Sequence, residues 1–235
     1  MRQVVLDTET TGLSPENGDR IIEIGCVELI NRKLTGHNLH FYINPERDSH
    51  EEALKVHGIS NEFLKDKPKF AQISDELVAY LKDAQVIIHN APFDIGFLNK
   101  EFERVSCSNM AQLVSGVIDT LSMAKEIYPG KRNSLDALCD RLEVDNSDRT
   151  LHGALLDAEL LADVYINMTR GQDALLMEVE QSDASTSHVK KIDLASFELP
   201  VIYATEDELL KHEDVMVQID KSSQGKSVWR QLQTG

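Results

Sequence analysis

The sequence predicts an α/β fold in which helices flank a mixed β-sheet. Three strand-like segments come first along the chain, and a helix–strand–helix–strand order with further helices follows them. With 235 residues, the chain is long enough to bury one substantial core and to carry a smaller appendage. We therefore expect one α/β domain followed by a short C-terminal region.

Hydrophobic patterning and turn-forming residues give the elements in chain order. Apolar or alternating runs predict strands at residues 3–9, 20–30, 38–43, 85–89 and 117–119. Helical spacing predicts helices over 73–81 and 153–168. Start signals predict two more: Pro92 opens a helix over 92–102, and Asn133 with Asp136 can cap a helix that ends at 142. The second and third strands are expected to pair antiparallel, because turn-forming residues lie between them.

Composition and charge limit the classes of protein that fit. No apolar run approaches the ~20 residues of a membrane helix, and the N-terminal residues do not form a secretory signal. The three cysteines, Cys26, Cys107 and Cys139, lie far apart and lack zinc-binding spacing, so free thiols of a cytoplasmic protein are expected. The net charge is −16. Proteins that hold nucleic acid unaided usually have a basic face, so bound cations would have to meet any phosphate here.

Carboxylates in three places are candidates for a metal site. Asp7 and Glu9 are two residues apart on the first strand, so both side chains project from one face. They repel each other and are costly to desolvate, and a divalent cation between them would relieve both effects. Asp94 lies at the start of a helix. Taken singly, these residues also fit a polar strand end and a helix N-terminal charge.

A histidine and an aspartate near the last predicted helix complete the set. His152 and Asp157 are five residues apart in TLHGALLDAELLADVY, so they do not share one helical stripe. We expect His152 on the segment that enters the helix and Asp157 fixed on the helix itself. That arrangement suits a general base beside a metal ligand, although His152 alone also fits a surface histidine.

Taken together, these residues resemble the motif of the DEDDh exonucleases. The order is Asp-x-Glu, then a distant Asp, then His-x4-Asp. The similarity extends through VLDTETTGL, VHGI, IIHNAPFDIGFL, PGKRNSLDALC and TLHGALLDAELLA, and covers about residues 3–172. The chain is identified as a member of this superfamily, and it is similar to members that proofread for bacterial replicative polymerases.

The resemblance implies a fold and a chemistry. The fold is ribonuclease H-like, with a five-stranded mixed sheet between helices. The implied activity is 3′→5′ exonucleolytic hydrolysis of DNA, which releases nucleoside 5′-monophosphates with two divalent ions, Mg²⁺ or Mn²⁺. The implied metal ligands are Asp7, Glu9, Asp94 and Asp157, which form the catalytic set with His152 as general base.

The resemblance also implies which residues meet the terminal nucleotide of the DNA. Glu52 is suited to a hydrogen bond with the 3′-hydroxyl group. His57, which we expect on a loop, would approach the sugar or the phosphate. The full implied substrate-binding set is Asp7, Glu9, Thr10, Glu52, His57 and Asp157.

The C-terminal region suggests a tether. The segment Gln181–His188 has no large hydrophobic residue and predicts a flexible linker. We expect a nuclease domain at 1–172, a linker at 173–188 and a polymerase-binding tail at 189–235, whose apolar anchors include Leu209, Leu210, Val215, Val217 and Trp229. The implied partners are a single-stranded or frayed 3′ DNA end, the catalytic (alpha) subunit of the polymerase, and a small theta-like subunit. Sliding-clamp binding is not expected, because residues 181–185 offer no apolar anchor.

Two alternatives remain open at the level of sequence. A 3′→5′ exoribonuclease of the same superfamily would share the five catalytic residues, although it has no need of a tether. A non-catalytic scaffold subunit would be expected to have lost at least one of the five, and all are present.

Overall fold

The computed structural model describes residues 1–147, 151–170 and 204–223. The chain divides into two compact units, Met1–Glu180 and Gln181–Gly235. In the described part of the chain, no helix is both long and apolar enough to cross a membrane.

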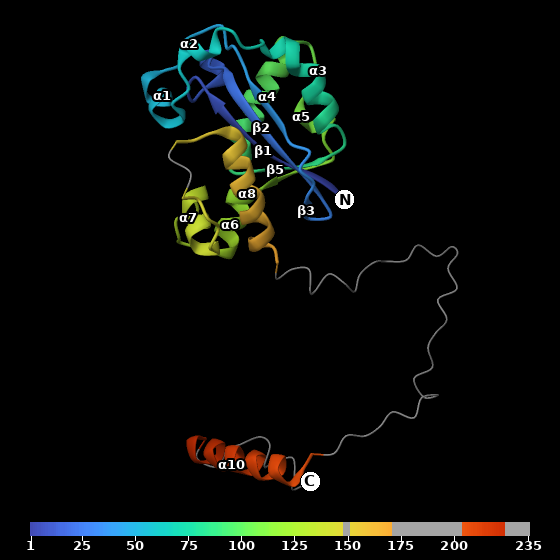
Figure 1. The fold of residues 1–235 in the computed structure, drawn as a ribbon, viewed down its shortest axis with the longest axis vertical. Coiled ribbons are helices and arrows are strands. Elements are labelled where there is room, and N and C mark those ends of the chain that lie inside the picture. The colour runs from blue at the N-terminus through green and yellow to red at the C-terminus, as the bar shows by residue number, and fades with distance from the viewer. Residues whose placement is uncertain (148–150, 171–203, 224–235) are drawn as a thin grey trace, which may run out of the picture. The chain divides into compact units, whose positions relative to one another are not determined.

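The first unit is built on one mixed sheet (Figure 1). The strand order is β3-β2-β1-β5-β6, and β4 also pairs with β2. Strand β1 is antiparallel to β2 and parallel to β5, which confirms the predicted mixed sheet. Six strands are present among the described residues, one more than expected, because two residues beyond the β2 turn also pair with β2. The strands are β1 (Arg2–Thr10), β2 (Ile21–Ile30), β3 (Lys33–Leu34), β4 (Leu39–Tyr42), β5 (Gln85–Ile88) and β6 (Gly116–Asp119).

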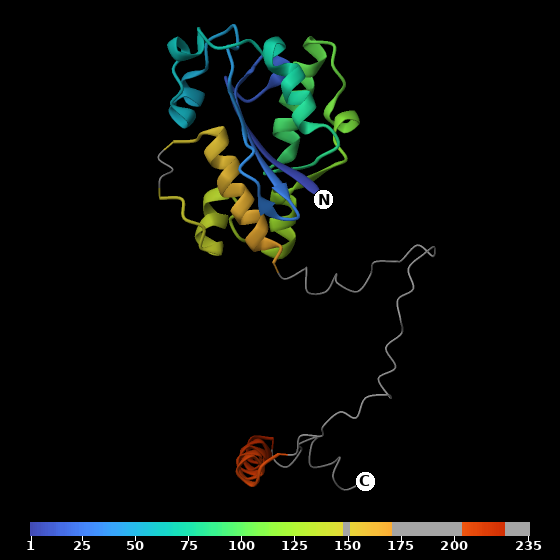
Figure 2. The ribbon, with the colours of Figure 1, turned by 45° about the vertical axis from the view of Figure 1, so that its right-hand side comes forward.

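Helices cover both faces of the sheet, as predicted (Figures 1 and 2). Helix α8 lies on one face with α6 and α7, and α3, α4 and α5 lie on the other. The helices of this unit are α1 (Glu51–His57), α2 (Asn61–Leu64), α3 (Phe70–Leu81), α4 (Ala91–Arg104), α5 (Met110–Leu113), α6 (Thr120–Ile127), α7 (Leu135–Leu142) and α8 (Ala154–Met168), with a 3₁₀ turn η1 (Pro15–Asn17).

Strand β1 sends alternate side chains into two separate cores. Val4 and Leu6 pack in the core that α3 and α4 cover. Val5 packs instead with apolar residues of α8. Since side chains alternate along a strand, Asp7 and Glu9 continue the row that faces α8. The pleat of β1 therefore places both carboxylates beneath that helix.

A glycine in β2 lets α8 come close to the sheet. Gly25 pairs directly with Asp7 across the β1–β2 ladder. A β-carbon on Gly25 would lie 2.3 Å from backbone atoms of Ala154 and Leu155, the first residues of α8. No side chain fits in that space. The N-terminal turn of α8, which carries Asp157, thus rests on the backbone of the sheet at the level of Asp7.

Two local predictions are wrong. His57 lies on a helix rather than a loop: it is the last residue of α1 and is buried, and Gly58 ends the helix in the left-handed conformation. Seven residues are too few for a clear helical period. Helix α7 is capped by Ser134, whose hydroxyl accepts from the Ala137 amide, and not by Asn133. The side chain of Asn133 instead accepts a hydrogen bond from Arg141.

The expectation of free thiols is confirmed. Cys26 and Cys139 are buried free cysteines, and Cys107 is a partly exposed one.

The second unit contains helix α10 (Glu206–Ser222), which the sequence patterning did not predict. Thr205 and Glu208 form a capping box at its start. The expected linker at 173–188 and Trp229 lie outside the described residues.

Candidate active site

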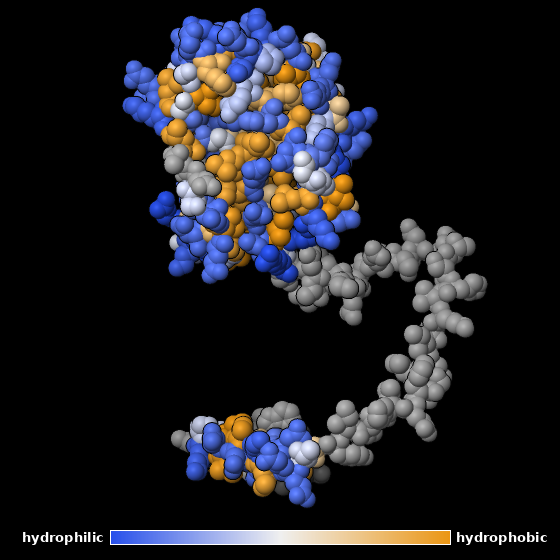
Figure 3. Space-filling view, viewed as in Figure 1, coloured by the Kyte–Doolittle hydropathy of each residue, from blue (hydrophilic) through white to orange (hydrophobic). Residues whose placement is uncertain are grey.

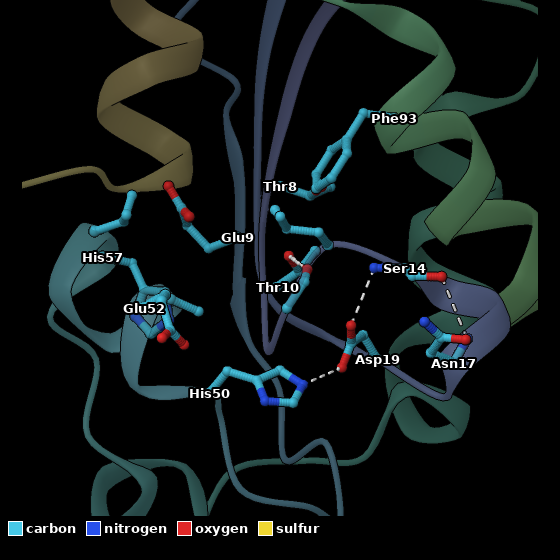
Figure 4. Close-up of a pocket in the computed structure, with 14 residues that line it drawn as sticks. Thr8, Glu9, Thr10, Ser14, Asn17, Asp19, His50, Glu52, His57 and Phe93 are labelled. Carbon is cyan, nitrogen blue, oxygen red and sulfur yellow. Dashed lines mark hydrogen bonds and ion pairs between the residues drawn. The ribbon is translucent and has the colours of Figure 1, made fainter.

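A cavity of about 600 Å³ opens beside the C-terminal end of β1 (Figure 4). Its walls come from the end of β1, from the turn that follows β1, from α1 and from the start of α4. Predicted site residues Glu9, Thr10, Glu52 and His57 all line it, together with Thr8, Gly12, Leu13, Ser14, Asn17, Asp19, His50, Ala53, Val56 and Phe93.

Three of the five predicted catalytic residues form a tight cluster at one side of this cavity. Potential ligand atoms of Glu9, His152 and Asp157 all lie within 4.8 Å of one another. Nδ1 of His152 lies 3.1 Å from Oδ2 of Asp157, which is 5% exposed at its side chain. His152 precedes α8 and Asp157 lies in its first turn, as the sequence predicts. The two carboxylates at this spacing suit a divalent cation, and the imidazole lies beside them.

Contacts with α1 hold His152 in place. The His152 backbone amide donates to the carbonyl of Val56, at 3.2 Å. Its neighbour Leu151 fills the space that a side chain on Gly58 would need, since a β-carbon there would lie 2.5 Å from Leu151 Cδ1. The end of α1 therefore positions the histidine as well as lining the cavity.

The remaining two predicted ligands adjoin the cluster without belonging to it. Asp7 lies on β1 two residues before Glu9 and on the same face of the strand. Asp94 lies buried in the first turn of α4, where Oδ1 accepts a hydrogen bond from Thr8 Oγ1 at 2.7 Å. The negative charge of Asp94, on α4, raises the pKa of Glu9, on β1.

The site strongly disfavours negative charge when no cation is bound. Burial raises the pKa of Glu9 to about 8, His152 opposes the rise, and the charges of Asp157, Glu23 and Asp94 add to it. Burial likewise raises the pKa of Asp94 to about 7, against the hydrogen bond from Thr8. A divalent cation would offset both costs, so the residues fit a metal site.

This electrostatic cost predicts a pH-dependent stability. Glu9 has a pKa of about 8 in the folded chain, against the ordinary 4.5 expected on unfolding. Between these two values the folded state binds more protons than the unfolded state, so stability falls as pH rises. Glu9→Gln is therefore expected to stabilise the metal-free protein near pH 8 by about 4 kcal/mol, with a clear rise in Tm, and to have little effect near pH 4.5.

Thermal unfolding in EDTA at both pH values measures this difference. Glu16→Gln is a suitable control, because Glu16 is 79% exposed at its side chain. Equal melting temperatures for the Glu9→Gln protein and the parent at both pH values would contradict the burial of an unfavourable charge.

The predicted substrate-binding residues differ in what they offer the cavity. The Thr10 hydroxyl already donates to the Gly12 carbonyl, at 2.6 Å. Glu52 is exposed in the first turn of α1. His57 Nδ1 accepts from the Ile59 amide at 2.9 Å, so Nε2 carries the proton. Nε2 is buried and has no hydrogen-bond partner among the described residues, and burial lowers the pKa of His57. His57 is therefore a neutral hydrogen-bond donor at the cavity wall.

Sequence reasoning missed a second polar pair in the cavity. Asp19 and His50 are hydrogen-bonded at 3.0 Å although 31 residues separate them. No local pattern links two such positions. Leu13 also lines the cavity and is 85% exposed. The sequence does not predict a binding role for it, because single exposed leucines are common on protein surfaces.

Known proteins with similar sequences are exonucleases. The family model described as RNase_T, Exonuclease, matches residues 4–165. The DNA polymerase III subunit epsilon of Pasteurella multocida is 49% identical, over 97% of this chain and 93% of its own length. The corresponding subunit of Escherichia coli is 46% identical, over 97% of each chain.

Solved structures agree on the fold. Exonuclease X, solved in complex with 5′ overhanging duplex DNA, aligns with a TM-score of 0.56 and 26% identity over 73% of this chain and 93% of its own. A structure of exonuclease I aligns with a TM-score of 0.63 over 74% of this chain and 42% of its own, and its 16% identity supports the fold alone.

The family match includes residues of all six strands of the sheet and the carboxylate cluster beneath α8. The epsilon subunits match over nearly the full length, including the C-terminal region. The chain therefore belongs to the exonuclease family and, within it, to the epsilon subunits of DNA polymerase III.

Proposed function

We propose that this chain is the proofreading 3′→5′ exonuclease of a bacterial DNA polymerase III. It hydrolyses the last phosphodiester bond of a single-stranded or frayed 3′ DNA end and releases a nucleoside 5′-monophosphate. The cluster of Glu9, His152 and Asp157 beside a nucleotide-sized cavity is the observation that carries this proposal.

The carboxylates act as ligands for two divalent ions, Mg²⁺ or Mn²⁺. Asp7, Glu9, Asp94 and Asp157 hold them, which the raised pKa values of Glu9 and Asp94 support. When bound, such ions supply the positive charge that meets the scissile phosphate and the leaving oxygen. The same ions reconcile a net charge of −16 with a nucleic-acid substrate.

His152 acts as the general base. Its imidazole accepts a proton from the attacking water, while the hydrogen bond between Nδ1 and Asp157 fixes the orientation of the ring. Its side chain is 45% exposed, so water can reach it.

The terminal nucleotide occupies the cavity. The Glu52 carboxylate accepts a hydrogen bond from the 3′-hydroxyl group, and His57 Nε2–H donates to a sugar or phosphate oxygen. The Thr10 segment lies against the sugar. These roles agree with the position of all three residues on the cavity wall.

Matched DNA and RNA oligonucleotides test the proposal. With a 5′ label, the purified chain should produce a ladder that shortens from the 3′ end, and with a 3′ label it should release mononucleotides at once. DNA should be the better substrate. Faster degradation of RNA would favour the exoribonuclease alternative, and degradation of neither would favour a scaffold subunit.

The C-terminal region tethers the nuclease to its polymerase in the cytoplasm. Helix α10 exposes Leu209, Leu210, Val215 and Val217 among hydrophilic side chains (Figure 3). Those side chains suit burial against the alpha subunit, which would hold the DNA and raise the effective concentration of nuclease at the primer end. A small theta-like subunit is a further partner, whereas the sliding clamp is not expected to bind.

Truncation tests this division into a nuclease (1–172), a linker (173–188) and a tail (189–235). A chain that ends at Gln172 should cleave single-stranded DNA within about twofold of the full-length rate but should not co-purify with the alpha subunit. Trp229→Ala in the full-length chain should weaken that association by at least about tenfold, because large aromatic residues dominate binding energy. Full-affinity binding by the truncated chain would place the tether on the nuclease domain instead.

A further inference from the structure

Two walls of the nucleotide cavity meet at one buried carboxylate. The turn after β1 supplies one wall, which includes Gly12 and Ser14. Helix α1 and His50, the residue before it, supply another. Figure 4 shows Asp19 between the two, with hydrogen bonds to Ser14 on one side and to His50 on the other. Asp19 is only 5% exposed, so its carboxylate is placed to set the spacing of the two walls.

The turn after β1 rests on this carboxylate. Oδ2 of Asp19 accepts a hydrogen bond from the Ser14 amide at 3.0 Å. A β-carbon on Gly12 would lie 2.5 Å from the same oxygen and 2.7 Å from Asp19 Cγ, so the Gly12 backbone packs directly on the carboxylate. Because only glycine allows so close an approach, the path of the turn past the cavity depends on where the carboxylate lies.

The same carboxylate contacts the start of α1. Oδ1 of Asp19 lies 3.0 Å from His50 Nε2 and 3.1 Å from Arg47 Nη1. Burial would raise the pKa of Asp19, but the hydrogen bonds from Ser14 and His50 and the charge of Arg47 lower it, so the side chain is ionised at neutral pH. The His50 amide also donates to the Thr11 carbonyl at 2.8 Å. Main-chain and side-chain contacts therefore join the same two walls.

The neighbouring residue, Arg20, fixes the position of Asp19. Its guanidinium donates two hydrogen bonds to the buried Glu101 carboxylate on α4, at 2.6 and 2.8 Å. The Arg20 carbonyl accepts from the Thr11 amide at 2.9 Å, and the Arg20 amide donates to Thr11 Oγ1 at 3.0 Å. Asp19 is thus anchored to α4 and to the end of β1, and the two walls are set against a fixed point.

Other contacts hold the carboxylate cluster beneath α8. The far end of α1 is joined to the segment before α8 by the hydrogen bond from the His152 amide to the Val56 carbonyl. Leu151 packs on Gly58 beside it. These contacts lie at the opposite end of the helix from those of Asp19. Loss of the Asp19 carboxylate should therefore alter the cavity and leave the cluster in place.

We infer that Asp19 is a positioning residue that holds the turn after β1 and the start of α1 at the spacing that the terminal nucleotide requires. This inference rests on the proposed function. Asp19 contacts both walls and the nucleotide lies between them, so the carboxylate acts on affinity for the nucleotide rather than on the chemical step. Loss of such a residue raises KM and leaves kcat nearly unchanged.

Nucleotide affinity and turnover, measured together, test this role. The Kd for thymidine 5′-monophosphate is measured with the full-length chain in Mg²⁺, and kcat and KM are measured on single-stranded DNA. Asp19→Ala should raise Kd and KM about tenfold, the order of one lost hydrogen bond to a charged group, while kcat stays within about twofold. Asp19→Asn keeps an oxygen that can accept from the Ser14 amide, so it should raise both constants only about threefold.

Glu28→Ala is the matched control that separates positioning from a general effect on stability. Glu28 is also a buried carboxylate with an arginine, a histidine and a hydroxyl group beside it, namely Arg2 at 2.6 Å, His37 at 3.7 Å and Thr35 at 2.9 Å. It does not line the cavity. Its loss should lower Tm, as the loss of Asp19 does, but should leave Kd, KM and kcat unchanged.

A lower Tm for Asp19→Ala with unchanged Kd and KM would overturn the inference, because Asp19 would then only stabilise the fold. The same rise in Kd for Glu28→Ala would overturn it as well, and so would a fall in kcat without a change in KM. If Asp19→Ala does not fold, Asp19→Asn decides by the same constants. A parent chain that binds the nucleotide but degrades no DNA would contradict the proposed function alone. A parent chain that binds no nucleotide would contradict both.

Discussion

Asp157→Asn is expected to reduce the exonuclease rate by at least about 10³-fold while the protein stays folded. The change keeps the shape of the side chain but removes a charge from the cluster with Glu9 and His152. A metal ligand contributes several kcal/mol to stabilising charge in the transition state, and each 1.4 kcal/mol is about tenfold in rate. The fold should persist, because the substitution also removes a buried charge that repels Glu9.

Steady-state rates on a labelled single strand, together with thermal unfolding, measure both parts of this expectation. Asp163→Asn is the matched control, since Asp163 lies on the same helix and is exposed. It should leave the rate unchanged.

Asp7→Ala should abolish activity in the same way as Asp157→Asn. Near-normal turnover in the Asp7→Ala or the Asp157→Asn protein would contradict the assignment of these residues as metal ligands.

His152→Ala is expected to slow hydrolysis by ~10²–10⁴-fold, the usual contribution of a general base. Metal binding should be largely kept, because the carboxylates that hold the ions remain. The acid limb of the pH–rate profile should also shift or disappear, since protonation of the imidazole would no longer limit the reaction.

Rates from about pH 5 to pH 9, with Mn²⁺ binding measured separately, provide the test. His37→Ala serves as control, because His37 is 72% exposed at its side chain and does not line the cavity. An acid limb that is unchanged in the His152→Ala protein would show that another group removes the proton from the attacking water.

The architecture could be predicted because its signals are local. The mostly apolar run at residues 3–9 predicted a strand, the two-residue spacing of Asp7 and Glu9 put them on one face of it, and the structure has them on the face that α8 covers. The helical period of 153–168 likewise predicted α8 within one residue, and with it the position of Asp157. Those two elements contain three of the five predicted catalytic residues, and His152 lies two residues before α8.

Other features depend on contacts between distant residues, which one sequence does not display. Strand β3 has only two residues and exists because Leu34 pairs with Leu29. Helix α1 is short, and its place in the cavity depends on the hydrogen bond from His50 to Thr11. The Asp19–His50 pair and the docking of Leu151 on Gly58 are tertiary in the same way. Such contacts form only when the whole sheet packs, so no local sequence pattern predicts them.

We propose that the carboxylate cluster beneath α8 is the metal centre of a DNA exonuclease. The most direct test follows release of the 3′-terminal nucleotide from a single strand by the full-length chain, first in EDTA and then as Mg²⁺ or Mn²⁺ is added. We expect no release in EDTA and a saturable return of activity with either ion. Equal release with and without the ions would contradict it.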